Sequence, residues 1–249
     1  MCKNKIPLLL LTLCILLIPA IGRAEDAEAI IRKMDEKYST ESGSSELAML
    51  VYPDADDTEN VRTFEIISHS RGDDETYMSF LSPRTIKGLT ILSREDDQWA
   101  YFPSTGRVRK IAAASKKESV RGVGGDFSYE DLGGGGFEEK YRFSIQASNE
   151  KIWILEGTPK KEGVIYSRIL ITVDRSTFLP QKIEFFTEED GLYKELLLGD
   201  VKRMSGRQLP TKMTMKNLRK NSMTVIITKR AKYGIDLPDK YFNPTRFYR

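Results

Sequence analysis

The sequence predicts a mainly β protein of the α+β class, in which one N-terminal helix precedes a large, curled antiparallel sheet. Two observations support this prediction. Apolar residues recur with period two in about a dozen short segments, and turn-forming residues such as Asp, Asn and Gly separate these segments as in antiparallel meanders. A sheet of this size must curl or split. An open barrel of about ten to twelve strands has room for a ligand, whereas a two-sheet sandwich fills its own core. The sequence alone leaves both arrangements open.

The N-terminus is expected to be a cleavable secretory leader, residues 1–24. Lys3 and Lys5 give it a positive start, an almost wholly apolar run follows, and Gly22 and Ala24 place small residues before the cleavage site. The apolar run is shorter than the roughly 20 residues that a spanning helix needs. We therefore expect cleavage after Ala24 and a periplasmic mature protein that does not span the membrane.

Charge and cysteine content exclude several classes of function. The leader holds three of the 39 basic residues, so the mature chain is left with 36 basic and 36 acidic residues. This balance gives no electrostatic case for nucleic-acid binding. Cys2 and Cys14 both lie in the leader, which excludes disulfides and thiolate metal sites from the mature protein. Residues 25–249 contain no Pro- or Ser-rich linker and are expected to form a single domain.

Residues 26–38 are expected to form the helix, because their apolar residues recur at spacings of three and four. After a short polar break the period changes to two. The predicted strands are centred on Leu47–Val51, Phe64–Ile66, Met78–Phe80, Leu89–Ile91, Trp99–Tyr101, Arg107–Ile111, Tyr141–Ile145, Ile152–Ile154, Val164–Val173, Ile183–Phe185, Leu192–Val201, Met213–Met215 and Val225–Ile227. Several of these strands are apolar on both faces, which favours an enclosed layer over a sheet with one solvated face.

No catalytic or metal-binding pattern emerges from the sequence. His69 is the only histidine and lies between two serines, where a solvated surface residue is the expected interpretation. The glycines of residues 122–125 suggest a phosphate loop, but Phe127 occupies the position where the GxGxxG pattern needs its last glycine. We therefore expect a non-enzymatic protein that has neither metal nor cofactor.

The glycine-rich stretch 122–136 also carries a cluster of carboxylates, which allows two interpretations. One is a calcium site, although the spacing matches no EF-hand. The other, which the sequence favours, is a structural turn in which Ser128 and Asp131 cap each other and Phe127 and Tyr129 hold the turn against the body of the protein.

Basic residues gather in the segment 107–121, among them Arg107 and Arg109. They suit a docking patch for anionic lipid headgroups or for a partner protein. They equally suit a strand edge that charge protects from pairing with another sheet. The sequence leaves both interpretations open.

Four segments of the chain resemble one protein family. They are FLSPRTIKGLTIL (Phe80–Leu92), WAYFPSTGRVRKI (Trp99–Ile111), GGDFSYEDL (Gly124–Leu132) and LPDKYFNPTRF (Leu237–Phe247). Together they resemble the LolA-like family of periplasmic outer-membrane lipoprotein-sorting proteins, in a broad and mostly uncharacterised branch. The resemblance implies a half-open antiparallel barrel with a helical lid and an apolar cavity, over residues 25–249.

The resemblance also implies a function, namely a non-enzymatic carrier of lipoproteins or other lipid-like hydrophobic ligands, with an inner-membrane transporter as a partner. Each acyl CH₂ exposed to water costs about 0.8 kcal/mol, so a sixteen-carbon chain would cross the periplasm unescorted at a cost near ~12 kcal/mol. Such a carrier needs a cavity and a movable cover, and no nucleotide. The alternative is a sensing or docking module that binds a membrane-protein partner.

The candidate site residues form two groups. Candidate ligand contacts are apolar residues on the predicted strands: Met49, Phe64, Met78, Phe80, Trp99 and Tyr101. An error of one residue in the register would turn any of them to the other face of the sheet. Candidates for a lid or for partner docking are Arg84, Arg107, Arg109, Asp126, Phe127 and Tyr129. Of these, Arg84 is the candidate for the cavity arginine with which LolA-like carriers hold their lid closed.

Overall fold

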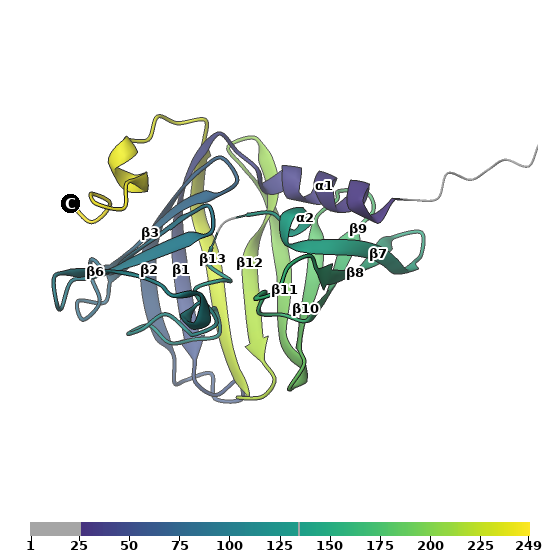
Figure 1. The fold of residues 1–249 in the computed structure, drawn as a ribbon, viewed down its shortest axis with the longest axis horizontal. Coiled ribbons are helices and arrows are strands. Elements are labelled where there is room, and N and C mark those ends of the chain that lie inside the picture. Colours follow the sequence, from purple (N-terminus) through teal and green to yellow (C-terminus); the bar gives the residue numbers. More distant parts are fainter. Residues whose placement is uncertain (1–25, 134) are drawn as a thin grey trace, which may run out of the picture.

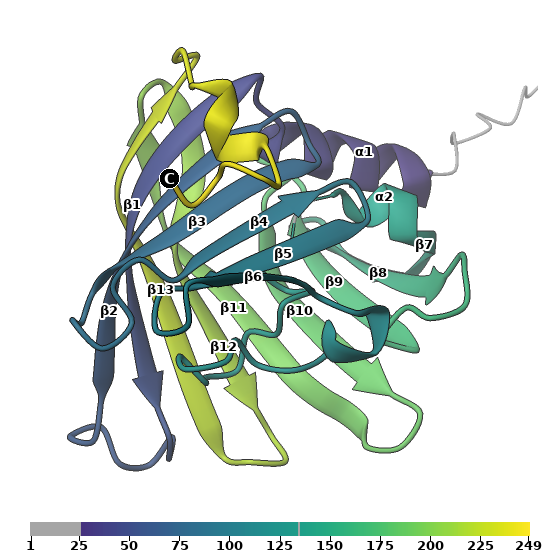
Figure 2. The same cartoon turned by 60° about the vertical axis from the view of Figure 1, so that its left-hand side comes forward.

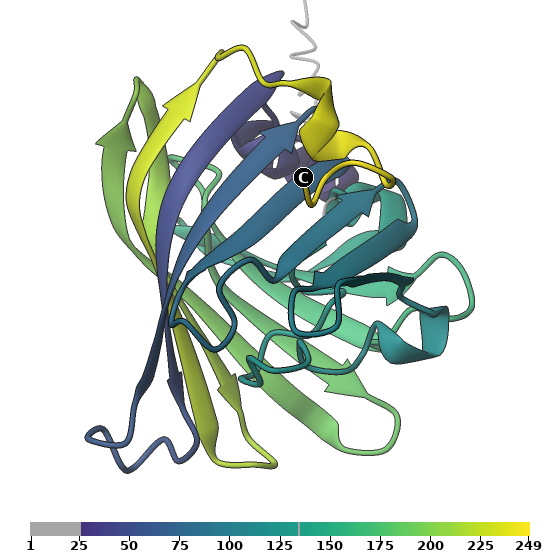
Figure 3. The ribbon, with the colours of Figure 1, turned by 90° about the vertical axis from the view of Figure 1, so that its left-hand side faces the viewer.

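Thirteen antiparallel strands form one sheet, which curls without closing around a hydrophobic interior (Figures 1 and 3). The computed structural model describes residues 26–133 and 135–249, so the leader predicted over residues 1–24 lies outside the described residues. The single curled sheet confirms the predicted mainly β fold. The two-sheet sandwich, the other arrangement that the sequence left open, is not formed.

The elements follow the predicted order closely. The first half consists of α1 (Ala27–Tyr38), β1 (Ser42–Tyr52), β2 (Arg62–Arg71), β3 (Glu75–Ser82), β4 (Thr90–Arg94), β5 (Asp97–Phe102), β6 (Arg107–Lys110) and the 3-10 turn η1 (Ala113–Ser115). The second half consists of α2 (Phe137–Lys140), β7 (Tyr141–Ser148), β8 (Ile152–Pro159), β9 (Arg168–Asp174), β10 (Pro180–Thr187), β11 (Gly191–Met204), β12 (Arg207–Asn217), β13 (Ser222–Tyr233) and the 3-10 turn η2 (Asp239–Phe242). Only β9 starts clearly later than predicted: Val164 and Ile165 border a groove, and the strand begins at Arg168.

Sheet order explains why the barrel is only half closed. The strands pair in the order β6-β5-β4-β3-β2-β1-β13-β12-β11-β10-β9-β8-β7, so β6 and β7 are consecutive in sequence but lie at the two free edges. The one long-range pairing joins β1 to β13, with Gly43 opposite Tyr233. Residues 111–133 and 135–140, between the two edge strands, cross the open side of the sheet (Figure 2). A connecting segment, and not a strand, therefore occupies the seam of the half-barrel.

Helix α1 lies across one end of the curled sheet, above α2 and β7 (Figure 1). It begins where the Asp26 carboxylate accepts a hydrogen bond from the backbone N–H of Glu28, as an N-cap residue does. Ile30, Ile31 and Met34 form its buried face, at the spacings that predicted the helix. The Glu28 carboxylate also accepts the backbone N–H of Phe143 on β7 at 2.9 Å, so the helix covers part of a sheet edge.

The sheet has a second apolar cluster on its outer face. There the C-terminal segment, which contains η2, packs its Phe242 and Phe247 against Tyr77 and Leu92 of the sheet, and all four side chains are buried (Figure 2). His69 packs in this cluster, with its ring 4.6 Å from the ring of Tyr241, and burial lowers its pKa. The prediction of a solvated surface histidine was therefore wrong, because the chain end packs over the strand that carries it.

The strands on either side of Gly157 leave no room for a side chain at this position. A Cβ added at Gly157 on β8 would lie 2.7 Å from a ring carbon of Phe143 and 2.8 Å from a methylene carbon of Ile169, which flank it on β7 and β9. Gly157→Ala should therefore lower the free energy of unfolding by about 1–3 kcal/mol, the usual cost of overpacking. Gly199→Ala on β11, where an added Cβ meets nothing within 4 Å, is the matched control and should be neutral or slightly stabilising. Urea unfolding curves of the two variants measure the difference, and equal curves would contradict the packing argument.

Candidate functional site

A cavity of about 450 Å³ lies between α1 and the inner face of the sheet. We call it the helix cavity. Its floor is apolar and comes mainly from three adjacent strands, β10, β11 and β12: Ile183, Leu196, Leu198 and Met213, with Met34 of α1 and Pro180 beside them. Its rim carries charged residues of α1, α2 and the β2–β3 turn: Arg32, Asp35, Glu36, Asp73, Glu138 and Glu139. The volume falls within the ~300–1,000 Å³ range of small-molecule sites.

A second cavity of about 200 Å³, the inner pocket, lies deeper under the connecting segment. Its apolar lining consists of Phe127, Phe137, Tyr141, Phe185, Leu196 and Met215. The two cavities share Leu196, Phe137 and the glycines at 135 and 136 as lining. The helix cavity and the inner pocket are therefore neighbouring chambers of one apolar interior, with a wall between them that includes two glycines.

The wall between these chambers is held by α1. The Asp35 carboxylate accepts the backbone N–H of Glu138 at 3.0 Å, at the start of α2, and Arg32 forms an ion pair with the Glu138 side chain at 2.9 Å. A Cβ at Gly136 would lie 2.6 Å from the Asp35 carboxylate, so any other residue there would displace this carboxylate from its bond to α2. Burial raises the pKa of Asp35 from 3.8 to about 6, the bonds from α2 backbone N–H groups lower it, and the nearby Glu138 and Asp73 raise it further.

The glycine-rich stretch forms the predicted structural turn. The Ser128 backbone N–H donates to the Asp131 carboxylate at 2.8 Å, and the Asp131 backbone N–H donates to the Ser128 hydroxyl at 3.2 Å, which is a reciprocal capping arrangement. Phe127 and Tyr129 are buried against the core, as expected. Asp126 is buried as well and accepts hydrogen bonds from the hydroxyls of Ser222 and Thr224 on β13. The stretch is thus anchored inside the half-barrel at several points.

A buried ion pair ties the same turn to the floor of the sheet. Lys194 of β11 lies 3.0 Å from the Asp131 carboxylate, and the exposed fractions of the two side chains are 4% and 5%. The Tyr166 hydroxyl donates to the other Asp131 oxygen at 2.7 Å and lies 3.3 Å from the Lys194 ammonium. Burial, with the Asp131 charge, raises the pKa of Tyr166 well above its usual range. Asp131 and Tyr166 also line the inner pocket, so this polar cluster borders an otherwise apolar space.

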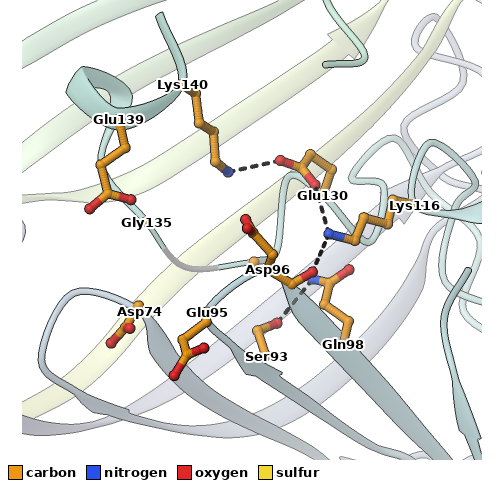
Figure 4. Close-up of a pocket in the computed structure, with 11 residues that line it drawn as sticks. Asp74, Ser93, Glu95, Asp96, Gln98, Lys116, Glu130, Gly135, Glu139 and Lys140 are labelled. Carbon is orange, nitrogen blue, oxygen red and sulfur yellow. Dashed lines mark hydrogen bonds and ion pairs between the residues drawn. The ribbon is translucent and has the colours of Figure 1, made fainter. Parts of the chain in front are cut away.

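Two further hollows open toward the seam. The polar pocket, of about 240 Å³, is lined by Asp74, Ser93, Glu95, Asp96, Gln98, Lys116, Glu130, Gly133, Gly135, Glu139 and Lys140 (Figure 4). The seam groove, of about 690 Å³, runs between residues 110–113 after β6 and residues 161–165 before β9. Glu130 and Lys140, which form an ion pair at 2.8 Å, line the polar pocket, the seam groove and the inner pocket. The pair therefore marks the junction between the apolar interior and the seam.

The structure divides the six candidate ligand contacts. Met49, Phe64, Met78 and Phe80 face the interior, but they are packed in the core beside the cavities and do not line them. Trp99 and Tyr101 lie on the outer face, where Trp99 pairs with Leu92 and Tyr101 stacks on Tyr248 of the C-terminal segment. Trp99 and Tyr101 therefore lie on the opposite face of the sheet from Met78 and Phe80. Most of the strand residues that line the cavities come from β10–β12, whose apolar faces were visible in the sequence.

The candidates for a lid or for docking also fall into separate places. Arg84 is exposed in the turn between β3 and β4, so the prediction that it holds a lid from inside the cavity was wrong. Arg107 and Arg109 are exposed on the edge strand β6, where both interpretations of the basic cluster remain open. Asp126, Phe127 and Tyr129 belong to the segment that covers the interior, but they are buried and are not available to a docking partner in this structure.

The rest of the structure adds two findings about the described residues. Over residues 26–133 and 135–249, no three His, Cys, Asp or Glu side chains are grouped so that they would hold a metal ion. In the same residues, neither helix is long and apolar enough to cross a membrane.

Comparisons with known proteins agree with this architecture. A protein-family model that is described only as an uncharacterized protein matches residues 72–249. Among solved structures, the chain is similar to a domain from Vibrio parahaemolyticus whose description assigns it to outer membrane lipoprotein sorting (24% identity, TM-score 0.76, 90% of this chain and 98% of that one). It is also similar to a DUF1329 family protein from Desulfovibrio piger (26%, 0.77, 87% and 95%) and to a LolA superfamily protein from Nitrosomonas europaea (23%, 0.73, 88% and 98%). None of the curated proteins matches the chain.

Proposed function

Because the chain belongs to the uncharacterized-protein family whose model it matches over residues 72–249, and has the half-open LolA-like fold, we propose that it is a non-enzymatic carrier of lipoproteins or other lipid-like hydrophobic ligands. The expected leader directs the protein to the periplasm, where we propose that it acts. The lipoprotein-sorting description of the Vibrio parahaemolyticus domain supports the same class of ligand for this chain.

The helix cavity is the observation that carries this proposal. In an ordinary core, side chains would fill a cavity of about 450 Å³ with an apolar floor, because protein interiors are close-packed. Here it remains open beneath a helix that is tied to α2 by polar contacts, the Asp35 cap and the Arg32–Glu138 pair, as well as by packing. Such a cover separates from its neighbour more easily than a wholly apolar interface, since water can replace its hydrogen bonds. A cavity with a separable cover is what a carrier of acyl chains requires.

Native mass spectrometry of the mature protein purified from periplasm, followed by lipid extraction, tests the proposal directly. We expect a co-purifying lipid or acylated peptide. An empty protein that also fails to bind the apolar fluorescent probe N-phenyl-1-naphthylamine would count against a carrier.

A pair of adjacent leucines supplies a sharper test. Leu198 lines the helix cavity, whereas Leu197 points to the opposite face of β11 and is exposed. Leu198→Trp should fill the cavity and weaken binding of N-phenyl-1-naphthylamine at least tenfold. Leu197→Trp adds the same side chain outside and should bind the probe as the wild type does. Fluorescence titration measures both, and unchanged binding by the Leu198 variant would show that the probe binds elsewhere.

Docking of a membrane-protein partner is a second candidate function, and the inner-membrane transporter of the carrier hypothesis is one such partner. Arg107 and Arg109, exposed on the free edge strand β6, favour this function. A photo-crosslinker placed at position 105, in the exposed turn before β6, should then capture one inner-membrane protein in living cells, and Arg107→Glu with Arg109→Glu should abolish the product. Capture by a protein whose cavity is empty would favour docking as the main function.

A further inference from the structure

The polar pocket is acidic although the mature chain is expected to be neutral overall. Five carboxylates and two ammonium groups line it. Lys116 and Lys140 both approach Glu130, at 3.9 Å and 2.8 Å, so these three side chains together carry one formal positive charge against the four other carboxylates. The other four carboxylates, Asp74, Glu95, Asp96 and Glu139, form no ion pair within the part of the chain that the structure describes. Figure 4 shows these carboxylates around the pocket, with the Lys116–Glu130–Lys140 contacts beside them.

A buried acceptor without a partner lies at the base of the same pocket. Gln98 on β5 is 3% exposed, and its amide N–H groups donate to the Ser93 hydroxyl at 2.9 Å and to the Tyr129 carbonyl at 2.8 Å. Its Oε1 is one of three buried side-chain polar atoms in the described residues without a hydrogen-bond partner. In Figure 4 the amide end of Gln98 extends from its strand toward Asp96 and Lys116. A buried acceptor left unsatisfied costs free energy, so a ligand that donates a hydrogen bond there would be favoured.

The polar pocket adjoins the apolar interior. It shares Glu130, Gly133, Gly135 and Lys140 with the lining of the inner pocket, so only the thin glycine-containing wall and one ion pair separate them. A ligand whose chain lies among the apolar side chains of the inner pocket would therefore place its head beside the carboxylates. An anionic head would be repelled there, and a head that carries a positive charge and N–H donors would be attracted.

We propose that the polar pocket is the headgroup site of the carrier and that it selects amphiphiles with a protonated primary amine. The proposal rests on the proposed carrier function and adds the chemical class of the ligand. The carboxylates of Glu95, Asp96 and Glu139 supply the negative potential, and the Gln98 Oε1 and Ser93 hydroxyl supply acceptors for the N–H groups. The inner pocket and the helix cavity take the hydrocarbon chain.

Three ten-carbon probes that differ only in the head test this selectivity: decylamine, decanol and decanoate. Each displaces N-phenyl-1-naphthylamine from the protein, below its micelle concentration and at pH 7. We expect decylamine to bind at least tenfold more tightly than decanol at low salt, and decanoate to bind more weakly than decanol. The preference for decylamine should shrink at high salt, because the carboxylates on the rim are exposed and their potential is screened.

A triple variant locates the selectivity. Glu95→Gln, Asp96→Asn and Glu139→Gln together remove three charges from the pocket and no ion pair of the described residues, and they should reduce the preference to threefold or less. The matched control, Glu59→Gln with Glu150→Gln and Glu188→Gln, removes three exposed charges from turns elsewhere and should keep the full preference. Decanol binding should be the same in both variants, which shows that the apolar chambers are intact.

The outcomes separate this proposal from the carrier function on which it rests. If no probe displaces the dye, the carrier function itself fails. If decanol binds but decylamine has no advantage, or if the advantage survives the triple variant, the amine site is overturned while the carrier remains. Calorimetry with ethylamine distinguishes a lipid headgroup from a free amine, and ethylamine binding as tight as that of decylamine would overturn the assignment to an amphiphile.

Discussion

Replacing Lys194 with methionine should lower the free energy of unfolding by about 3–5 kcal/mol, the largest effect that we expect from a single substitution. The variant leaves Asp131 with its negative charge, 5% exposed, in an interior that otherwise offers it only the Ser128 N–H and the Tyr166 hydroxyl. Loss of one partner from a buried ion pair is costly because the remaining charge is neither hydrated nor compensated. Urea unfolding monitored by circular dichroism measures the loss.

A second lysine on a neighbouring strand is the control. Lys182 forms ion pairs with Glu184 and Glu195 at 3.0 Å and 2.7 Å, but its side chain is 32% exposed. Lys182→Met should cost only about 0–1 kcal/mol, as exposed ion pairs do. Adding Asp131→Asn to Lys194→Met should recover part of the loss, since it removes the uncompensated charge. If the Lys194 and Lys182 variants lose equal stability, the buried pair does not anchor the connecting segment.

Asparagine at position 35 should stabilise the protein at pH 7 and change its response to acid. The Asp35 carboxyl has a pKa of about 6 in the folded protein, against 3.8 ordinarily. A carboxyl whose pKa is higher in the folded state binds its proton more tightly there, so its contribution to stability is complete below pH 3.8 and is lost as the pH rises through about 6. The shift corresponds to about 3 kcal/mol at most. Asp35→Asn, which resembles the protonated carboxyl, should avoid this loss.

Unfolding measured from pH 4.5 to 7.5 checks this expectation. The difference in stability between Asp35→Asn and the wild type should grow as the pH rises and level off above pH 7. Glu36→Gln, which removes an exposed carboxylate from the same helix, should give no such difference. A difference that grows toward acid pH would contradict this expectation, because it would mean that the hydrogen bonds from the α2 backbone N–H groups lower the pKa of Asp35 more than burial raises it.

The sequence was sufficient to predict the architecture, because alternation and turn residues are local signals. Turns such as Asp190-Gly191 and Lys220-Asn221 mark strand ends, and the helix was visible from Ile30, Ile31 and Met34. The capping of Ser128 and Asp131 was equally local, since both partners lie within one turn. Features of this kind depend on residues that are close in the chain, which a single sequence displays.

The cavity could not be predicted in the same way, because it depends on contacts between distant segments. Trp99 and Tyr101 alternate like core residues, but the apolar surface that covers them is the C-terminal segment on the outer face. The sequence also does not reveal that Asp131 meets Lys194 and Tyr166, since these residues are far apart in the chain and become neighbours only when the stretch before residue 134 packs across the sheet. Apolar pattern therefore identified buried strands, but not which of them border empty space.

The free edges at β6 and β7 have a mechanical consequence. To widen a closed barrel, a complete ladder of main-chain hydrogen bonds between two strands must break. In this sheet β6 and β7 share no ladder within the described residues, so moving them apart disturbs the contacts of α1 and of the connecting segment but breaks no strand pairing. Separating β6 from β7 therefore costs less free energy than separating any two paired strands of the sheet. If the protein carries lipid-like ligands as proposed, this compliance would let the interior widen for bulkier chains while the thirteen paired strands keep their register.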